Sequence, residues 1–148
     1  MITDPPGART APGDCLFCGI ADGRIDAHIV HRDADTVAFL DHRPVFAGHV
    51  LLVPRTHVPV LADLPADLIS PVFTAAQRLS AAMVAGLGAQ GSFVAINNTV
   101  SQSVPHLHVH IVPRTTGDGL RGFFWPRTRY VDHAEASAVA DRIRRALS

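Results

Sequence analysis

One seven-residue segment, residues 106–112, constrains the fold and the chemistry of this chain more than any other. It reads His-Leu-His-Val-His-Ile-Val, so three histidines alternate with aliphatic residues. Strand side chains point alternately to the two faces, with a rise of roughly 3.3 Å per residue. The segment therefore predicts a strand with three imidazoles in a row about 6.6 Å apart and with Leu107, Val109 and Ile111 facing a core. Packing alone does not explain this row, which indicates a catalytic site or a metal site.

Composition narrows the class of protein. The chain has 148 residues, 47 % hydrophobic and 18 % charged, as expected for one globular domain with a sizeable core. Its zero net charge disfavours nucleic acids and membrane surfaces as partners, and no apolar run approaches the ~20 residues of a membrane helix. We expect residues 1–14 to be a disordered lead-in without a signal peptide, residues 15–148 to form one domain, and the protein to be cytoplasmic.

The remaining periodicity predicts an α+β fold. Apolar residues repeat at three and four across residues 65–87, which predicts a long helix that ends at Gly88. Pro71 lies inside this window, so the helix either kinks or begins there. Shorter helices are expected at 16–22 and 132–147, and strands at 28–32, 36–40, 49–54, 93–97 and 106–113. Tightly connected strands favour a five-stranded antiparallel sheet, whose exposed edge favours a homodimer.

The two cysteines of the chain, Cys15 and Cys18, form a Cys-x-x-Cys pair. A redox dithiol normally lies between a strand and a helix, and no strand is predicted ahead of this pair. Two thiolates at this spacing suit one edge of a tetrahedral zinc site, which is the reading we favour. A redox pair and a pair without special chemistry remain as alternatives.

A polar loop at residues 97–103 directly precedes the histidine row. Its Asn, Thr, Gln and Ser side chains and its backbone amides are donors for phosphate oxygens, although such residues are also common in ordinary turns. Their position beside the histidines favours phosphoryl or nucleotidyl transfer.

At this point the chain resembles the histidine-triad (HIT) family. The histidine row matches the signature of that family, and the resemblance covers about residues 15–114. Other segments that match, in the same order, are Cys15–Cys18, Ala38–Asp41, Pro44, Gly48–Pro54, His57 and Gln102–Val104. The tail, residues 117–127, resembles a HINT-related subgroup whose plant members act on adenylyl sulfate.

The resemblance implies a reaction. The middle histidine, His108, would attack the α-phosphorus of an adenylylated substrate, and water would then release the nucleoside monophosphate from the nucleotidyl-histidine. A neutral imidazole is a competent nucleophile near pH 7, and we expect a backbone carbonyl to hold His108 in one tautomer. His110 would donate to a phosphate oxygen or to the leaving group, and His49 would close the same pocket.

The resemblance also implies the substrate contacts. Asn98, Gln102 and Ser103 would contact the α-phosphate or the leaving group, and Asp41 would accept both ribose hydroxyls. Four apolar residues would enclose the purine base, although a role in the core explains each of them equally well: Phe17, Ile20, Phe39 and Leu40.

A structural zinc site is the last implication. In some branches of the family a zinc ion is held by the Cys-x-x-Cys pair, the histidine after the buried strand and the first triad histidine, here Cys15, Cys18, His57 and His106. Four protein ligands close such a site, so the zinc would tie the N-terminal part to the sheet. A catalytic zinc on all three triad histidines is the alternative, and it would leave the cysteines without a purpose.

Two further functions compete with a nucleotide hydrolase. The same pocket could bind nucleotides for regulation without turnover. A basic and aromatic cluster could instead stack the bases of RNA or DNA, against which the zero net charge weighs: Arg121, Phe123, Phe124, Trp125, Arg127, Arg129 and Tyr130.

Overall fold

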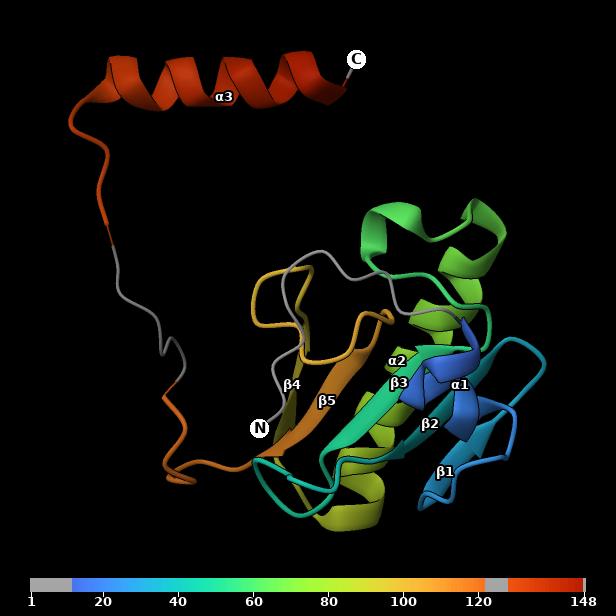
Figure 1. Cartoon of the computed structure of the whole chain (residues 1–148). Coiled ribbons are helices and arrows are strands. Elements are labelled where there is room, and N and C mark those ends of the chain that lie inside the picture. The colour runs from blue at the N-terminus through green and yellow to red at the C-terminus, as the bar shows by residue number, and fades with distance from the viewer. Residues whose placement is uncertain (1–11, 122–127, 148) are drawn as a thin grey trace. The chain divides into compact units, whose positions relative to one another are not determined.

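The computed structural model describes residues 12–121 and 128–147 and divides by its contacts into two units, residues 1–116 and 117–148 (Figure 1). The first unit carries the sheet, and the second carries helix α3, His133–Leu147. Four members of the basic and aromatic cluster, Phe123, Phe124, Trp125 and Arg127, lie outside the described residues, as does most of the expected lead-in, residues 1–11. A single domain over residues 15–148 remains a prediction.

The first unit is built on a five-stranded antiparallel sheet, which confirms the predicted α+β class. Its strands lie in the order β1-β2-β3-β5-β4. Their bounds are β1 Ile29–Arg32, β2 Thr36–Leu40, β3 Val50–Pro54, β4 Gly91–Ile96 and β5 Val109–Arg114. In this order β5 lies between β3 and β4, and His110 pairs with Leu51 on one side and with Ala95 on the other.

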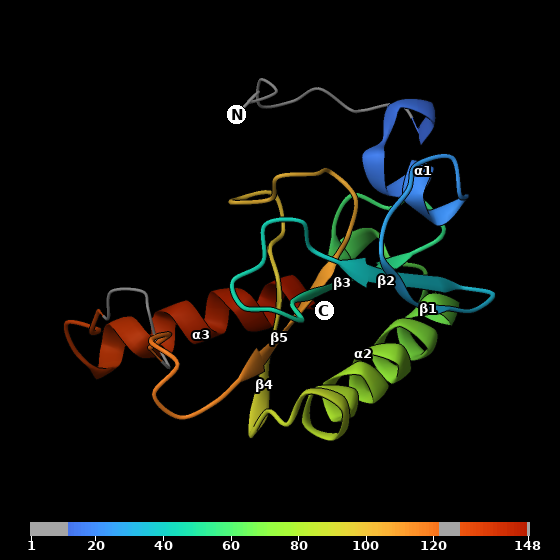
Figure 2. The ribbon, with the colours of Figure 1, turned by 90° about the horizontal axis from the view of Figure 1, so that it is seen from below.

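One face of the sheet is covered by the long helix α2, Ala66–Leu87 (Figure 2). Its buried residues pack against Ala38, Leu52, Val109 and Ile111 of the sheet. The helix runs through Pro71 from Ala66, so it does not begin at the proline. It ends as predicted at Gly88, which has a φ of 69°. By length and composition alone α2 could cross a membrane. Its buried apolar residues pack against the sheet as part of the core.

The opposite face of the sheet carries the short helix α1, Leu16–Ala21. Alternation along β2 and β3 sends Val37, Phe39, Leu51 and Val53 to this side, where they form a second apolar cluster with residues of α1. Val109 and Ile111 of β5 belong to the core under α2. His110, between these two residues, therefore lies on the α1 face.

The first part of the histidine row does not belong to the sheet ladder. We predicted a strand from His106, but β5 begins at Val109. The backbone N–H of Leu107 donates instead to the carbonyl of Val58, 2.7 Å away, in the segment that follows β3. The chain thus approaches β5 alongside residues 54–58, and this brings His106 next to His57.

Candidate functional site

The histidine row divides into two environments on the α1 face. His106, His108 and His49 are all less than 5 % exposed, although their side chains are polar. Ring centroids of His108 and His110 lie 5.0 Å apart, and those of His106 and His57 lie 4.9 Å apart. One end of the row therefore joins the segment after β3, and the other end joins the start of β3.

The first environment contains the four predicted metal ligands. Nδ1 of His106 lies 3.4 Å from Sγ of Cys15 and 3.5 Å from Sγ of Cys18, and Nδ1 of His57 lies 3.2 Å from Sγ of Cys18. All four ligand atoms lie within 4.8 Å of one another. A tetrahedral zinc with ordinary bond lengths separates its sulfur and nitrogen ligands by about 3.6 Å, so the cluster fits this metal.

The protonation of this cluster also suits a metal. The Nε2–H of His106 donates to the carbonyl of Pro54 at 2.9 Å, so the lone pair of Nδ1 points toward the two sulfurs. Burial lowers the pKa of His106 to about 4, which keeps its ring neutral. Burial and the neighbouring Cys15 raise the pKa of Cys18 to about 11 in the metal-free chain, so binding of a cation would release a proton.

The second environment contains the predicted nucleophile, His108. Its Nδ1–H donates to the carbonyl of His106 at 2.7 Å, as we expected, and this leaves the lone pair on Nε2. Burial lowers the pKa of His108, and the opposing influences of the His106 carbonyl and of Asp41 are smaller. The ring is therefore neutral near pH 7. Phe17 contacts it edge-on, with centroids 5.0 Å apart.

Beside His108 lie His110, His49 and Asp41. His49 Nε2 lies 3.0 Å from His110 Nδ1 and 3.7 Å from Asp41 Oδ2. The other carboxylate oxygen of Asp41 accepts the backbone N–H of Arg43 at 2.9 Å. Burial, together with His108 and His49, lowers the pKa of His110 to about 4, and burial also lowers the pKa of His49. Two neutral imidazoles and one carboxylate thus adjoin the nucleophile.

Two of the predicted phosphate contacts, Asn98 and Gln102, form hydrogen bonds with backbone groups of the protein. Asn98 Oδ1 accepts the backbone N–H of Leu61 at 2.8 Å, and Gln102 Nε2 donates to the carbonyl of Pro59 at 2.6 Å. Both amides therefore tie the loop to the segment before α2. Ser103 is exposed, and no bond of its side chain is described. No pattern in the sequence signals the bonds of Asn98 and Gln102, because their partners are backbone groups of a distant segment.

Three of the four predicted base contacts are buried, and their contact with a base stays a prediction. Phe17, Ile20 and Phe39 are buried in the cluster between α1 and the sheet, and the ring of Phe17 bridges Phe39 and His108. Leu40, at the end of β2, is 37 % exposed. These residues are thus part of a core that reaches the edge of the histidine site.

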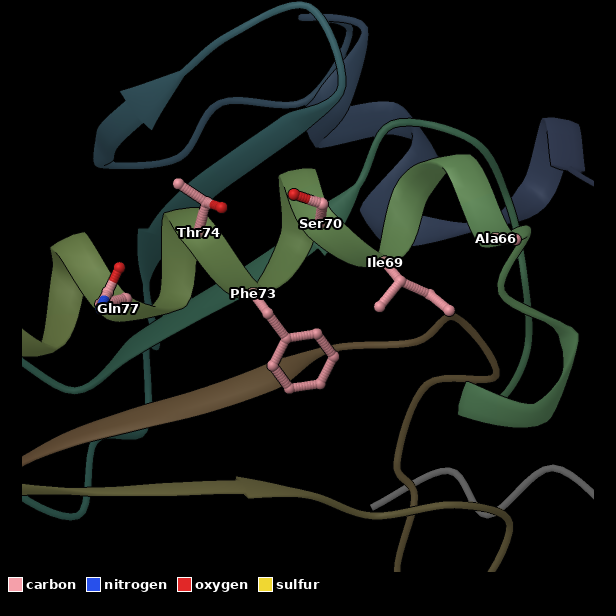
Figure 3. A pocket seen from close by; sticks show the side chains of 6 residues that line it. All are labelled: Ala66, Ile69, Ser70, Phe73, Thr74 and Gln77. Atoms are coloured by element: carbon pink, nitrogen blue, oxygen red, sulfur yellow. The ribbon is translucent and has the colours of Figure 1, made fainter.

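A shallow hollow lies elsewhere, along α2 (Figure 3). It is lined by residues of that helix alone, among them Ile69 and Phe73, which project from the same side of it. Because α2 covers the face opposite the histidines, this hollow is not part of the histidine site.

Sequence comparisons agree with this geometry. The HIT domain family matches residues 22–117. An uncharacterized HIT-like protein of Saccharolobus solfataricus is 39 % identical over 106 residues, which cover 70 % of this chain and 76 % of its own. Adenylylsulfatase HINT3 of Arabidopsis thaliana is 29 % identical over 147 residues, covering 95 % of this chain and 73 % of its own. Adenosine 5′-monophosphoramidase HNT1 of Candida albicans is 30 % identical over 118 residues, covering 76 % and 78 %.

Solved structures share the fold. A Streptococcus mutans protein superposes with a TM-score of 0.84 at 28 % identity, covering 99 % of this chain and all of its own. A zinc-bound histidine triad family protein of Mycobacterium smegmatis gives a TM-score of 0.71 at 31 % identity, covering 89 % of this chain and 99 % of its own.

Proposed function

This chain belongs to the HIT domain family, and from this premise we propose that it is a nucleotide hydrolase or transferase. The substrates would be adenylylated small molecules, cleaved at the α-phosphate. The observation that carries the proposal is the state of His108: the ring is buried and neutral, its Nδ1–H is bound to the His106 carbonyl, and its Nε2 lone pair is free for attack.

In the proposed reaction Nε2 of His108 attacks the α-phosphorus. A nitrogen–phosphorus bond forms as the bond from phosphorus to the leaving group breaks. The Nε2–H of the neutral His110 ring donates a hydrogen bond to that group, which takes any proton it needs from solvent. Water then attacks the nucleotidyl-histidine, which releases the nucleoside monophosphate and restores the imidazole. Asp41 and the residues around Phe17 would hold the ribose and the base.

The leaving group distinguishes three candidate substrates. Relatives named adenylylsulfatase and adenosine 5′-monophosphoramidase support sulfate and an amine, and a dinucleoside polyphosphate is the third candidate. The adenylylsulfatase aligns with 95 % of this chain, and its subgroup has a similar tail at residues 117–127. We therefore rank adenylyl sulfate first.

Release of AMP from these three substrates tests the function. We expect His108→Ala to lower kcat by at least a thousandfold for each substrate, because no other group in the site replaces the nucleophile. His133→Ala is the matched control, since His133 is exposed at the start of α3 and none of the proposed roles falls on it. If the wild-type protein bound AMP but released it from none of the substrates, a regulatory nucleotide-binding module would be the better description.

We further propose a structural zinc ion on Cys15, Cys18, His57 and His106. The spacing of the four ligand atoms and the bond from His106 to Pro54 support it, as does the zinc-bound structure from Mycobacterium smegmatis. Thiol ligands stay reduced in the cytoplasm, which is the compartment we propose. The zinc would connect α1 with the sheet and would take no part in the reaction.

We also propose a homodimer formed along β4. This strand is at an end of the sheet, and Ser80 of α2 contacts Ser92 of β4, so one side of α2 lies next to this edge. Val94 pairs with Ile111 and therefore faces the α2 side, where it is 44 % exposed. Ile69 and Phe73 are exposed on one side of α2 (Figure 3), and a second copy would cover these side chains together with Val94.

A further inference from the structure

We propose that the backbone N–H of Val45 fixes the protons of His49 and, through it, of His110, so that His110 presents an Nε2–H donor to the leaving group. His49 is then a positioning residue that acts through His110. The inference rests on the proposed function and deepens it, because it states how the hydrogen-bond donor to the leaving group is prepared.

The first link is the bond from Val45 to His49. The backbone N–H of Val45 donates to Nδ1 of His49 at 3.1 Å. A neutral imidazole has one nitrogen that accepts and one that carries the proton. Since Nδ1 accepts, the proton of His49 must be on Nε2. Burial lowers the pKa of His49 and keeps its ring in this neutral form.

The second link is the bond from His49 to His110. His49 Nε2 lies 3.0 Å from His110 Nδ1, whereas Asp41 Oδ2, at 3.7 Å, is beyond hydrogen-bond distance. The Nε2–H of His49 therefore donates to Nδ1 of His110. This places the proton of His110 on Nε2, the nitrogen that makes no bond to His49.

The bond from His49 to His110 also disfavours metal binding by the cluster of Asp41, His49 and His110. Their ligand atoms lie within 4.8 Å of one another, a spacing that a transition-metal ion accepts. Binding a metal would require the proton of His49 to move from Nε2 to Nδ1, where it would face the N–H of Val45. The hydrogen bonds in the cysteine cluster run the other way. The backbone partner of His106 accepts a hydrogen bond from Nε2–H, which leaves the lone pair of Nδ1 next to the sulfurs. The backbone partners thus make His49 and His110 a pair of hydrogen-bond donors and leave the cysteine cluster able to bind a metal.

The tautomers can be read directly by nuclear magnetic resonance. Long-range proton–nitrogen correlation on the ¹⁵N-histidine-labelled full chain, at a pH above 7, distinguishes a proton on Nδ1 from a proton on Nε2. We expect His49 and His110 both to carry it on Nε2, and His108 to carry it on Nδ1. A proton on Nδ1 of His110 in the wild-type chain would overturn the inference, and this measurement needs no variant.

A proline substitution removes the first link. Val45→Pro deletes the N–H that His49 accepts, and we expect His49 and His110 to become mixtures of tautomers. The control is Ala47→Pro in the same loop. The backbone N–H of His49 donates to the Phe46 carbonyl and closes a four-residue turn. Ala47 is the second residue of this turn, a position that favours proline. With a φ of 99° for Gly48 the turn accommodates this control.

Turnover separates positioning from damage to the fold. An amine is a poor leaving group that depends on the hydrogen bond from His110 as its charge develops, whereas sulfate leaves as a stable anion. We expect Val45→Pro to lower kcat for adenosine 5′-phosphoramidate about threefold or more, and to change kcat for adenylyl sulfate less than twofold. An equal loss on both substrates would contradict the inference. If the wild-type chain cleaved neither substrate, the proposed function would fail, while the tautomers would still be tested by resonance.

Discussion

The three histidines that are most deeply buried each have one ring nitrogen bound to the backbone, and this bond decides the role of the other nitrogen. His106 and His108 donate to the carbonyls of Pro54 and His106, and both keep a lone pair for a metal or a phosphorus atom. His49 accepts from Val45 and keeps a proton. Identical side chains are thus given different chemistry by their backbone partners.

Burial of neutral histidines has a consequence for stability. The pKa of His110 is about 4 in the folded chain, below the ordinary value of 6.5. Between these values the unfolded chain binds a proton that the folded chain does not, so stability is fully present above about pH 6.5 and falls as the pH falls toward 4. We expect His110 to contribute on the order of 3 kcal/mol to this fall.

Urea unfolding at several pH values measures this contribution. The free energy of unfolding of His110→Gln should decrease less steeply than that of the wild-type chain between pH 6.5 and pH 4. His133→Gln, at an exposed residue of α3, is the control for removal of a histidine. Equal slopes for His110→Gln and the wild-type chain would show that His110 titrates normally.

Among the elements, α1 depends most on the proposed zinc. It has only six residues, too few for an isolated helix to be stable in water. Its position is set by Cys15, Cys18 and the buried side chains of Phe17 and Ile20. Zinc would join this helix to residues 57 and 106, which follow β3 and precede β5.

Removal of the metal should therefore loosen α1 selectively. In hydrogen exchange with a chelator present, we expect the amides of Gly19 and Asp22, which bond to Cys15 and Cys18, to exchange at least tenfold faster. Amides in the middle of α2 should change little, because the core under the sheet does not include the ligands. His57→Ala should give the same pattern without a chelator. Uniform acceleration over α1 and α2 would argue against a local role of the metal.

For helices and strands, the sequence predicts the bounds that depend on the periodicity of apolar residues. The pattern of three and four in α2 and the alternation in β2 and β3 follow from burial on one or both faces, and these elements lie within one or two residues of the prediction. The start of β5 was wrong by three residues, because Leu107 bonds to Val58 rather than to the sheet. The amide bonds of Asn98 and Gln102 and the bond from Val45 to His49 were not predicted, since each joins a side chain to a backbone group.

For the whole molecule, we assign the proposed dimer contact to the β4 edge, where Val94 is exposed on the face next to α2. Val94→Arg places a charge on this edge, on the face next to α2. We expect light scattering to give twice the chain mass for the wild-type protein and the chain mass for Val94→Arg, with an unchanged circular dichroism spectrum. Val100→Arg, at a residue that is 78 % exposed in the loop before the histidines, is the control and should remain a dimer. A monomeric wild-type protein at micromolar concentration would contradict the proposed interface.

The central claim for the whole molecule is covalent nucleotidyl transfer through His108, and intact-protein mass measures it most directly. The full chain and His108→Ala are mixed with adenosine 5′-phosphoramidate or adenylyl sulfate and quenched rapidly without acid, because a phosphorus–nitrogen bond to histidine is labile in acid. The account predicts an adenylyl adduct on the wild-type protein and none on His108→Ala. Release of AMP by His108→Ala at the wild-type rate, or an adduct on both proteins, would contradict it.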